Sequence, residues 1–196
     1  MNHRQRRRRR QSRVRGWILA LILFTLAVIY ILPNVKARMQ YPVKYESEIR
    51  AAAGAYDLPP ALIAAIAVTE SAYRPEARSN MDARGLMQIT PTTGEWIAGH
   101  LKEKSAFTAD ALYDPITSLR YACWYVDFLL EQFDGDEACA IAGYHAGQGS
   151  VRKWLNDPNY SVDGRTLYAF PDDAPQTRHY VSKVQKAYEY YKKVYK

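Results

Sequence analysis

The sequence predicts an all-α domain that follows one N-terminal transmembrane helix. Residues 16–32 carry no charge, and a helix of this length spans about 25 Å, close to a hydrocarbon core of about 30 Å. From residue 45 onward, apolar residues recur at three- and four-residue spacing, and no pair of segments shows the alternation of paired strands. A fold of about 150 residues can bury roughly two-thirds of its unfolded surface, so one core is expected.

The net charge of +7 is concentrated before the apolar segment. Eight of the 27 Lys and Arg residues lie within residues 1–15, which contain no acid, so the remaining 19 basic residues face 20 acidic ones. An arginine-rich tail that binds nucleic acid would not explain the apolar helix directly after it. The positive-inside rule instead places this basic tail in the cytoplasm and the C-terminal domain outside, with the lipid bilayer as a partner and no nucleic acid.

The aromatic residues Trp17 and Tyr30 lie at the two ends of the apolar segment, where interfacial aromatics are common. A cleaved signal peptide is the alternative, since residues 35–37 loosely resemble a small-x-small cleavage site. Lys36 inside that site and the long apolar stretch favour an uncleaved, single-pass anchor. The predicted organisation is a cytoplasmic tail (1–15), a transmembrane helix (16–32), a linker (33–44) and one domain (45–196).

Seven helices are expected in this domain, each with apolar residues at helical spacing. Proline-containing breaks such as residues 56–59 separate them, and Pro60 suits the first turn of a helix. The predicted ranges are 45–56, 60–71, 91–100, 115–133, 136–146, 148–155 and 177–195.

The two cysteines, Cys123 and Cys139, would lie outside the cell, where disulfides persist. If the helices on either side of residues 134–135 run antiparallel, the two positions differ by about 10 Å along the axes, too far for a bridge. Two buried thiols are therefore predicted.

Glu70 is the first candidate for chemistry. It ends the helix 60–70, which is apolar around its whole circumference and is therefore expected in the core. Burial and the negative end of the helix dipole both raise the pKa of a carboxyl group there. A carboxylic acid that stays protonated near neutrality can act as the general acid of glycoside cleavage. The alternative is an ordinary solvated glutamate at a frayed helix end.

Three further clusters carry candidate binding residues. Gln88 interrupts an apolar run after a turn at Gly85, so its amide either holds a sugar substituent or bonds nearby backbone. Tyr144 precedes a glycine-rich stretch and could stack on a sugar ring. His145 beside it could be a catalytic base, but a hydrogen-bonded structural histidine is the more common case for a single histidine in such a position.

The last cluster, residues 175–181, opens the final helix. Gln176 or Thr177 could cap that helix, and Tyr180 could face inward. The alternative is a plain helix start without a functional role.

In order and spacing these four clusters resemble the soluble lytic transglycosylase family of the goose-type lysozyme superfamily, over essentially all of residues 45–196. The family's Glu-Ser pair matches Glu70 and Ser71, its next Ser matches Ser79, and its Gly-Leu-Met-Gln element matches residues 85–88. Further agreements are Asp114-Pro115, Tyr-x-Ala-Gly at 144–147 and Thr-Arg-x-Tyr-Val at 177–181. The full layout is similar to the single-pass, membrane-anchored transglycosylases of Gram-positive bacteria.

Four positions depart from the family pattern. His145 stands where Asn is usual, Gln176 where Glu is usual, Thr90 where Met is common, and Asp82 where Gly is usual.

The resemblance implies a lysozyme-like domain that cleaves the MurNAc-GlcNAc β-1,4 bond of peptidoglycan glycan strands and forms 1,6-anhydro-MurNAc products. It implies Glu70 as general acid and base, and a substrate-binding set made of Ser71, Ser79, Gln88, Tyr144, His145, Gln176 and Tyr180. The alternatives are a hydrolytic muramidase of the same fold and a non-catalytic peptidoglycan-binding module. No metal-binding or nucleotide-binding motif occurs, so no cofactor is expected.

Overall fold

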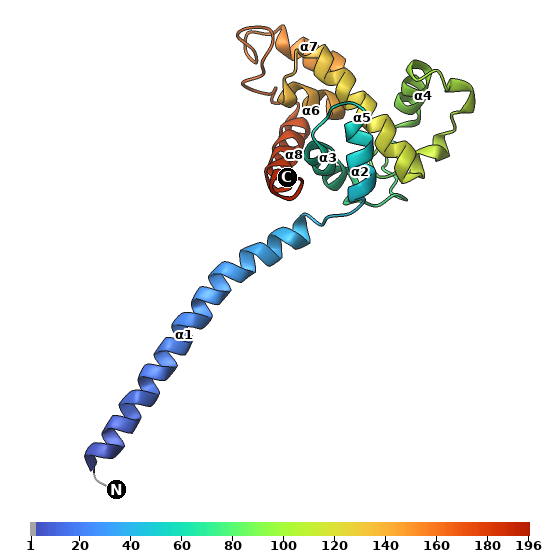
Figure 1. Cartoon of the computed structure of the whole chain (residues 1–196). Coiled ribbons are helices and arrows are strands. Elements are labelled where there is room, and N and C mark those ends of the chain that lie inside the picture. Colours follow the sequence, from blue (N-terminus) through green and yellow to red (C-terminus); the bar gives the residue numbers. More distant parts are fainter. Residues whose placement is uncertain (1–2) are drawn as a thin grey trace. The chain divides into compact units, whose positions relative to one another are not determined.

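The computed structural model describes the backbone of residues 3–196 and the side chains of residues 16–32 and 35–196. The arginine side chains of the predicted basic tail lie outside the described residues. The chain forms two compact units, Met1–Pro42 and Val43–Lys196 (Figure 1).

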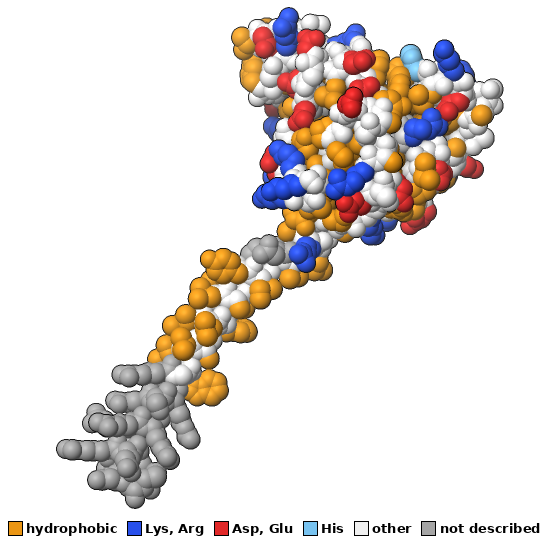
Figure 2. Space-filling view, viewed as in Figure 1, with side chains coloured by type: hydrophobic (Ala, Val, Ile, Leu, Met, Phe, Trp, Pro, Cys, Tyr) orange, Lys and Arg blue, Asp and Glu red, His pale blue; other side chains and the backbone are white. Residues whose placement is uncertain are grey.

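The first unit contains one helix, α1 (His3–Gln40). Its segment Gly16–Gln40 is long and apolar enough to cross a membrane, and Figure 2 shows hydrophobic side chains over the visible face of the apolar stretch. Trp17 and Tyr30, at the two ends of the apolar stretch, are largely exposed.

The helix was expected to end at residue 32, but it continues past Pro33 to Gln40. One proline removes a single intrahelical donor, and residues 35–40 include good helix formers such as Lys36, Ala37 and Met39. The non-helical part of the predicted linker is therefore confined to residues 41–44.

The second unit is helical, and within the described residues its only β-type pairs are two isolated bridges, Arg78 with Arg84 and Arg84 with Ile89. All seven predicted helices are present to within two residues at each end. Two short 3₁₀ turns between α4 and α5 were not predicted, because segments of three to five residues have no periodicity to read. The elements are α2 (Glu46–Gly54), α3 (Pro60–Ser71), α4 (Pro91–His100), η1 (Lys104–Ala106), η2 (Ala109–Tyr113), α5 (Pro115–Gln132), α6 (Glu137–Ala146), α7 (Gln148–Leu155) and α8 (Pro175–Val194).

Local sequence explains where several helices begin. Proline occupies the first turn of α3, α4, α5 and α8, where its missing N–H costs no hydrogen bond. The side chains of Thr90, Asp114 and Asp136 cap α4, α5 and α6 by accepting a bond from a backbone N–H three residues on.

Helix α3 is the centre of the core. Its residues Ala61–Ala67 are all buried, and it packs most extensively against α8 and also against α2 and α5. Figure 1 shows α3 enclosed by these neighbours. Four of the buried residues are alanines, and small side chains let neighbouring helices approach closely. Because α3 is held on several sides, Glu70 in its last turn has a fixed position at the edge of the core.

Cys123 on α5 and Cys139 on α6 are both buried and free. Burial raises the pKa of each thiol to about 12, so both stay uncharged and unreactive at neutral pH. The prediction of two buried thiols is confirmed.

Candidate active site

Glu70 lies in the last turn of α3, next to Ala72, which ends the helix in the left-handed conformation. Tyr180 of α8 donates a hydrogen bond of 2.6 Å from its hydroxyl to Glu70 Oε1. Burial raises the pKa of Glu70 to about 7, and the Tyr180 hydrogen bond and the positive charge of Lys183 partly oppose that rise. At neutral pH the carboxyl group is therefore present in both protonation states, which general acid and base catalysis requires.

A cleft of about 480 Å³ opens above this carboxyl group. Its walls come from the end of α3, the loop before α4, the first turn of α4, and the middle of α5 and end of α6. Glu70 is the only carboxylate among the residues that line it. The lining residues are Glu70, Ser79, Met81, Ala83, Gln88, Ile89, Thr90, Thr93, Tyr125, Tyr144, His145, Ala146 and Gly147.

Three side chains from α6 and α8 form a connected group beside Glu70. The His145 ring stacks on the Tyr180 ring, with centroids 4.6 Å apart. His145 Nδ1 lies 3.1 Å from Thr177 Oγ1, and Thr177 is buried. Burial lowers the pKa of His145, so its ring is neutral at pH 7. His145 is therefore hydrogen-bonded, as a structural histidine would be, and it also lines the cleft.

Tyr144 forms part of the cleft wall. Its hydroxyl donates to the backbone carbonyl of Met87 over 2.9 Å, and its ring centroid lies 5.5 Å from that of Tyr125. The hydroxyl thus ties α6 to the loop before α4, while the ring still lines the cleft.

Gln88 has a positive φ of 49°, which explains the turn that interrupts the apolar run. Its amide Nε2 donates to the carbonyls of Gly85 and Ala77, over 2.9 and 3.2 Å. The side chain also lines the cleft. The amide nitrogen therefore holds the loop, and the carbonyl oxygen Oε1 is the part that remains for a ligand.

Ser79 shapes the same loop. Its Oγ accepts hydrogen bonds from the backbone N–H groups of Met81 and Ala83, over 3.2 and 3.0 Å. The residue is exposed and lines the cleft. Its hydroxyl hydrogen can therefore be donated to a bound molecule.

Comparison with known proteins decides the family. Residues 47–163, more than half of the chain, match the family model described as the Transglycosylase SLT domain. The chain belongs to this family. Tyr180 and Thr177 lie beyond the matched range, so the SLT match alone does not identify their contacts with Glu70 and His145.

Two curated relatives of the SLT chain illustrate the likeness. The soluble lytic murein transglycosylase of Escherichia coli (strain K12) is 30% identical over 155 residues, which cover 78% of this chain and 24% of that protein. The membrane-bound lytic murein transglycosylase C of Yersinia pestis (strain Pestoides F) is 29% identical over 202 residues, which cover 93% of this chain and 56% of that protein. The SLT chain thus spans about a quarter of the length of the first relative.

Solved structures agree with the sequence match. The 70 kDa soluble lytic transglycosylase from Escherichia coli superposes with a TM-score of 0.72 at 26% identity, covering 86% of this chain and 27% of that one. An inactive glutamate-to-glutamine mutant of lytic transglycosylase Slt from Pseudomonas aeruginosa gives 0.67 at 28% identity, covering 80% and 25%. The predicted fold class, an all-α lysozyme-like domain of the lytic transglycosylase type, is confirmed.

Three predicted substrate-binding residues, Tyr180, Ser71 and Gln176, do not line the cleft. Tyr180 is buried and contacts Glu70 instead. Ser71 is buried, and its Oγ donates to the carbonyl of Leu86 and accepts from the N–H of Arg74, over 2.8 and 3.0 Å. It therefore holds the loop against the end of α3. Gln176 is exposed on α8 and does not line the cleft.

The predicted cap at Gln176 or Thr177 is wrong. Helix α8 begins at Pro175 after Ala174, and no side chain caps it. Proline in the first turn starts the helix one or two residues earlier than the polar residues suggested, because its φ is already helical.

The structure gives local reasons for two departures from the family pattern. Asp82 has a positive φ of 58°, which asparagine and aspartate tolerate better than most residues. Its carboxylate accepts hydrogen bonds from Arg78 and Arg84. Thr90 lines the cleft and caps α4, since its Oγ1 accepts from the N–H of Thr93 over 3.2 Å.

Sequence reasoning missed several cleft residues of the SLT domain. Tyr125 lies within an amphipathic helix whose inward residues all look like core. Thr93 and Met81 are ordinary polar and apolar residues of a helix start and a loop. Only the packing of α5 against α4 and α6 brings such residues to the cleft, and no local pattern marks them.

The raised pKa of Glu70 predicts a pH-dependent stability difference between the parent protein and the Glu70→Gln variant. The folded state keeps its proton up to about pH 7, whereas the unfolded state loses it near 4.5. The folded parent therefore loses stability as pH rises between these values, and the variant does not. We expect Glu70→Gln to gain up to roughly 3 kcal/mol relative to the parent between pH 4 and pH 8.

Urea unfolding of parent and variant at pH 4, 6 and 8 measures this difference. A difference in unfolding free energy that stays constant with pH would contradict a raised pKa for Glu70.

Proposed function

We propose that this chain is a peptidoglycan lytic transglycosylase that cleaves the MurNAc-GlcNAc β-1,4 bond. The observation that carries the proposal is Glu70, a carboxyl group with a pKa of about 7 that is the only acid lining a cleft of about 480 Å³. Hydrolytic glycosidases generally use two carboxylates across the scissile bond. A cleft with one acid suits a reaction in which the substrate supplies its own nucleophile.

In the proposed reaction, Glu70 donates its proton to the glycosidic oxygen, and the bond between that oxygen and the anomeric carbon of N-acetylmuramic acid breaks. The substrate's acetamido group assists departure of the leaving sugar. The Glu70 carboxylate then removes the proton from the 6-hydroxyl of the same muramic residue, and this oxygen bonds to the anomeric carbon. The product is a 1,6-anhydro ring, no water is consumed, and Glu70 is protonated again for the next cycle.

The two oxygens of Glu70 have different roles in this proposal. Tyr180 holds Oε1 by its hydrogen bond, so Oε2 is the oxygen assigned to proton transfer. His145 stacks on Tyr180 and keeps that ring in place. Tyr180 and Ser71 are positioning residues, because each acts through another group.

Four residues are proposed to hold the glycan strand directly. Ser79 and Gln88 offer a hydroxyl and an amide oxygen to sugar substituents, and Tyr144 and His145 offer aromatic rings. Gln176 is not included, since it is exposed away from the cleft. A cleft lined by both polar groups and aromatic rings suits a polymer of sugar rings as the partner.

We infer that α1 anchors the enzyme in the cell membrane. Support comes from its length and composition and from a curated relative named as membrane-bound. The excess of arginine in residues 1–15 favours a cytoplasmic N-terminus, so the catalytic domain would face the cell wall. Protease protection in right-side-out vesicles tests this orientation, because a domain degraded only after lysis would contradict it.

Mass spectrometry of the products released from purified peptidoglycan tests the reaction. The full chain in mild detergent is expected to release anhydro-muropeptides. Products with reducing ends, each heavier by one water, would show a hydrolase of the same fold instead. Binding to peptidoglycan without any release would show a binding module.

A further inference from the structure

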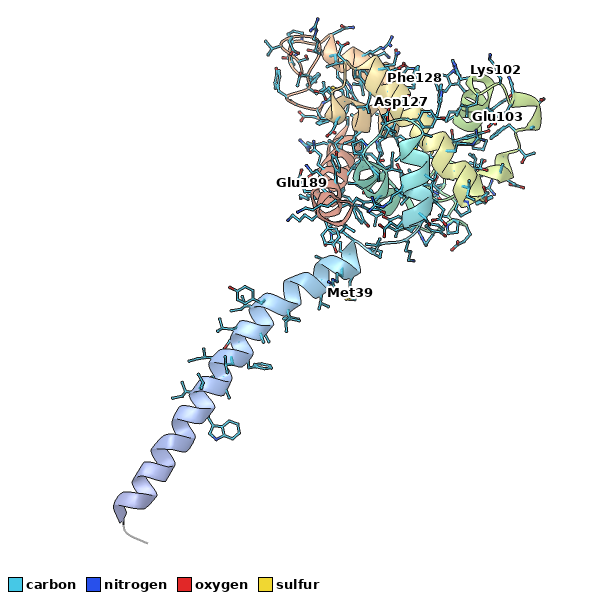
Figure 3. All side chains as sticks on the ribbon, viewed as in Figure 1. Met39, Lys102, Glu103, Asp127, Phe128 and Glu189 are labelled. Carbon is cyan, nitrogen blue, oxygen red and sulfur yellow. The ribbon has the colours of Figure 1, made fainter. Side chains whose placement is uncertain are left out.

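A cluster of five aromatic side chains lies between α4 and α5. It consists of Trp96, His100, Trp124, Tyr125 and Phe128, here called the α4–α5 aromatic cluster. The Trp96 ring centroid lies 5.2 Å from that of Phe128, 5.4 Å from that of Trp124 and 4.5 Å from that of His100. Figure 3 labels Phe128 on α5, with Lys102 and Glu103 just after the end of α4.

This cluster is continuous with the cleft above Glu70. Tyr125 lines the cleft, and its ring centroid lies 6.0 Å from that of Trp96. On α4, Thr93 lines the cleft, and Trp96 and His100 follow on the same helix face, three and seven residues later. Seven helical residues span about 10 Å, so the aromatic surface extends well beyond the reaction centre.

The cluster is exposed at Trp96 and His100, whereas Trp124, Tyr125 and Phe128 are half-buried. Trp96 is 37% exposed and His100 is exposed. A second cavity, of about 290 Å³, adjoins these two side chains and includes Glu95, Gly99 and Lys104. Lys104 Nζ lies 3.2 Å from Glu95 Oε1. The surface therefore combines aromatic rings with a hydrogen-bond donor, Lys104, and a hydrogen-bond acceptor, Glu95.

We propose that the α4–α5 aromatic cluster and its adjoining cavity form a second glycan-binding site, occupied by sugars of the same strand beyond the cleft. The apolar C–H face of a pyranose fits an exposed aromatic ring, and its hydroxyl and acetamido groups fit Glu95, His100 and Lys104. Because the residues that line the cleft adjoin the aromatic cluster, a single extended glycan strand can contact both. The inference rests on the proposed function, since it takes the cleft's ligand to be a glycan strand.

Binding measured without turnover tests the site. The full chain with Glu70→Gln is titrated calorimetrically, in detergent, with uncrosslinked peptidoglycan strands and with the corresponding disaccharide. Adding Trp96→Ala is expected to weaken binding of long strands about tenfold, the effect of losing one aromatic anchor. The disaccharide, which is short enough to occupy the cleft without reaching the cluster, should lose much less affinity, so the preference for long strands should disappear.

Two variants serve as controls. Trp96→Phe keeps an aromatic face and should retain most of the preference for long strands. Trp154→Ala removes a tryptophan of α7 that contacts Phe170 and does not line the cleft, so it should leave the preference intact. If Trp96→Ala does not fold, His100→Ala at the exposed end of the cluster provides the same comparison.

Three results would overturn the proposal. The first is an equal loss of affinity for the long strands and for the short ligand, which would mean that Trp96 affects binding only through the wall of the cleft. The second is no loss for either ligand. The third is self-association of the parent that Trp96→Ala abolishes in sedimentation experiments, which would make the cluster a contact between copies. Failure of the proposed reaction is separate, because a parent that releases no products can still show length-dependent binding.

Discussion

Replacing Glu70 by glutamine is expected to lower the rate of glycan cleavage by about 10²–10⁴-fold, the range lost when a general acid or base is removed. Glutamine keeps the shape of the side chain, and its carbonyl oxygen can still accept the hydrogen bond from Tyr180. It cannot donate a proton to the glycosidic oxygen or take one from the 6-hydroxyl. The chemical step should therefore fail while strand binding persists.

Product release from purified peptidoglycan, quantified by chromatography over time, measures this loss. Glu131→Gln, an exposed residue of α5, is the matched control and should cleave at the parent rate. The unfolding free energy of Glu70→Gln at pH 8 should be at least that of the parent, which separates lost chemistry from lost folding. A Glu70→Gln variant that keeps more than about a tenth of the parent rate would remove Glu70 as the general acid.

Gly85→Ala is expected to destabilise the domain by about 3–4 kcal/mol, from backbone strain and overpacking together. Gly85 has a φ of +74°, and a Cβ added there would lie 1.8 Å from the carbonyl oxygen of Leu112. That oxygen belongs to the backbone and cannot rotate away. The whole loop that carries Gln88 would have to move, because Gly85 O accepts from the Gln88 amide. Activity should fall together with stability.

Gly135→Ala is the matched control for this substitution. Gly135 has a similar φ of +83°, but no atom lies within 4 Å of the added Cβ. Its cost should be limited to the conformational term of about 1–2 kcal/mol. Thermal and urea unfolding of both variants measures the two costs, and equal costs would contradict a collision with Leu112.

The sequence was a good guide to the elements of this fold because their signals are local. Prolines in first turns, aspartate and threonine caps, and apolar residues at helical spacing all act within a few residues, so the helix ranges were predicted closely. The same holds for the buried character of α3 and hence for the raised pKa of Glu70. The prediction failed where a second local signal competed, as at Pro33 inside α1 and at Pro175, which starts α8 before Gln176.

The site depended on contacts between distant segments. Tyr180 donates to Glu70 from 110 positions away in the chain, and His145 meets Thr177 across 32 positions. Ser71 matched the family pattern and Gln176 departed from it, and both were assigned to the substrate-binding set. Ser71 is buried beside the cleft, whereas Gln176 is exposed and does not line it.

The all-α class, the family, the apolar N-terminal segment and the acid at the end of a buried helix can all be read from the amino-acid sequence. The groups that surround that acid, and the aromatic residues of α4 and α5 that continue from its cleft, are brought together by helix packing and have no local signal. Helix boundaries follow from hydrogen bonds between near neighbours, whereas burial and ring contacts depend on how whole helices pack.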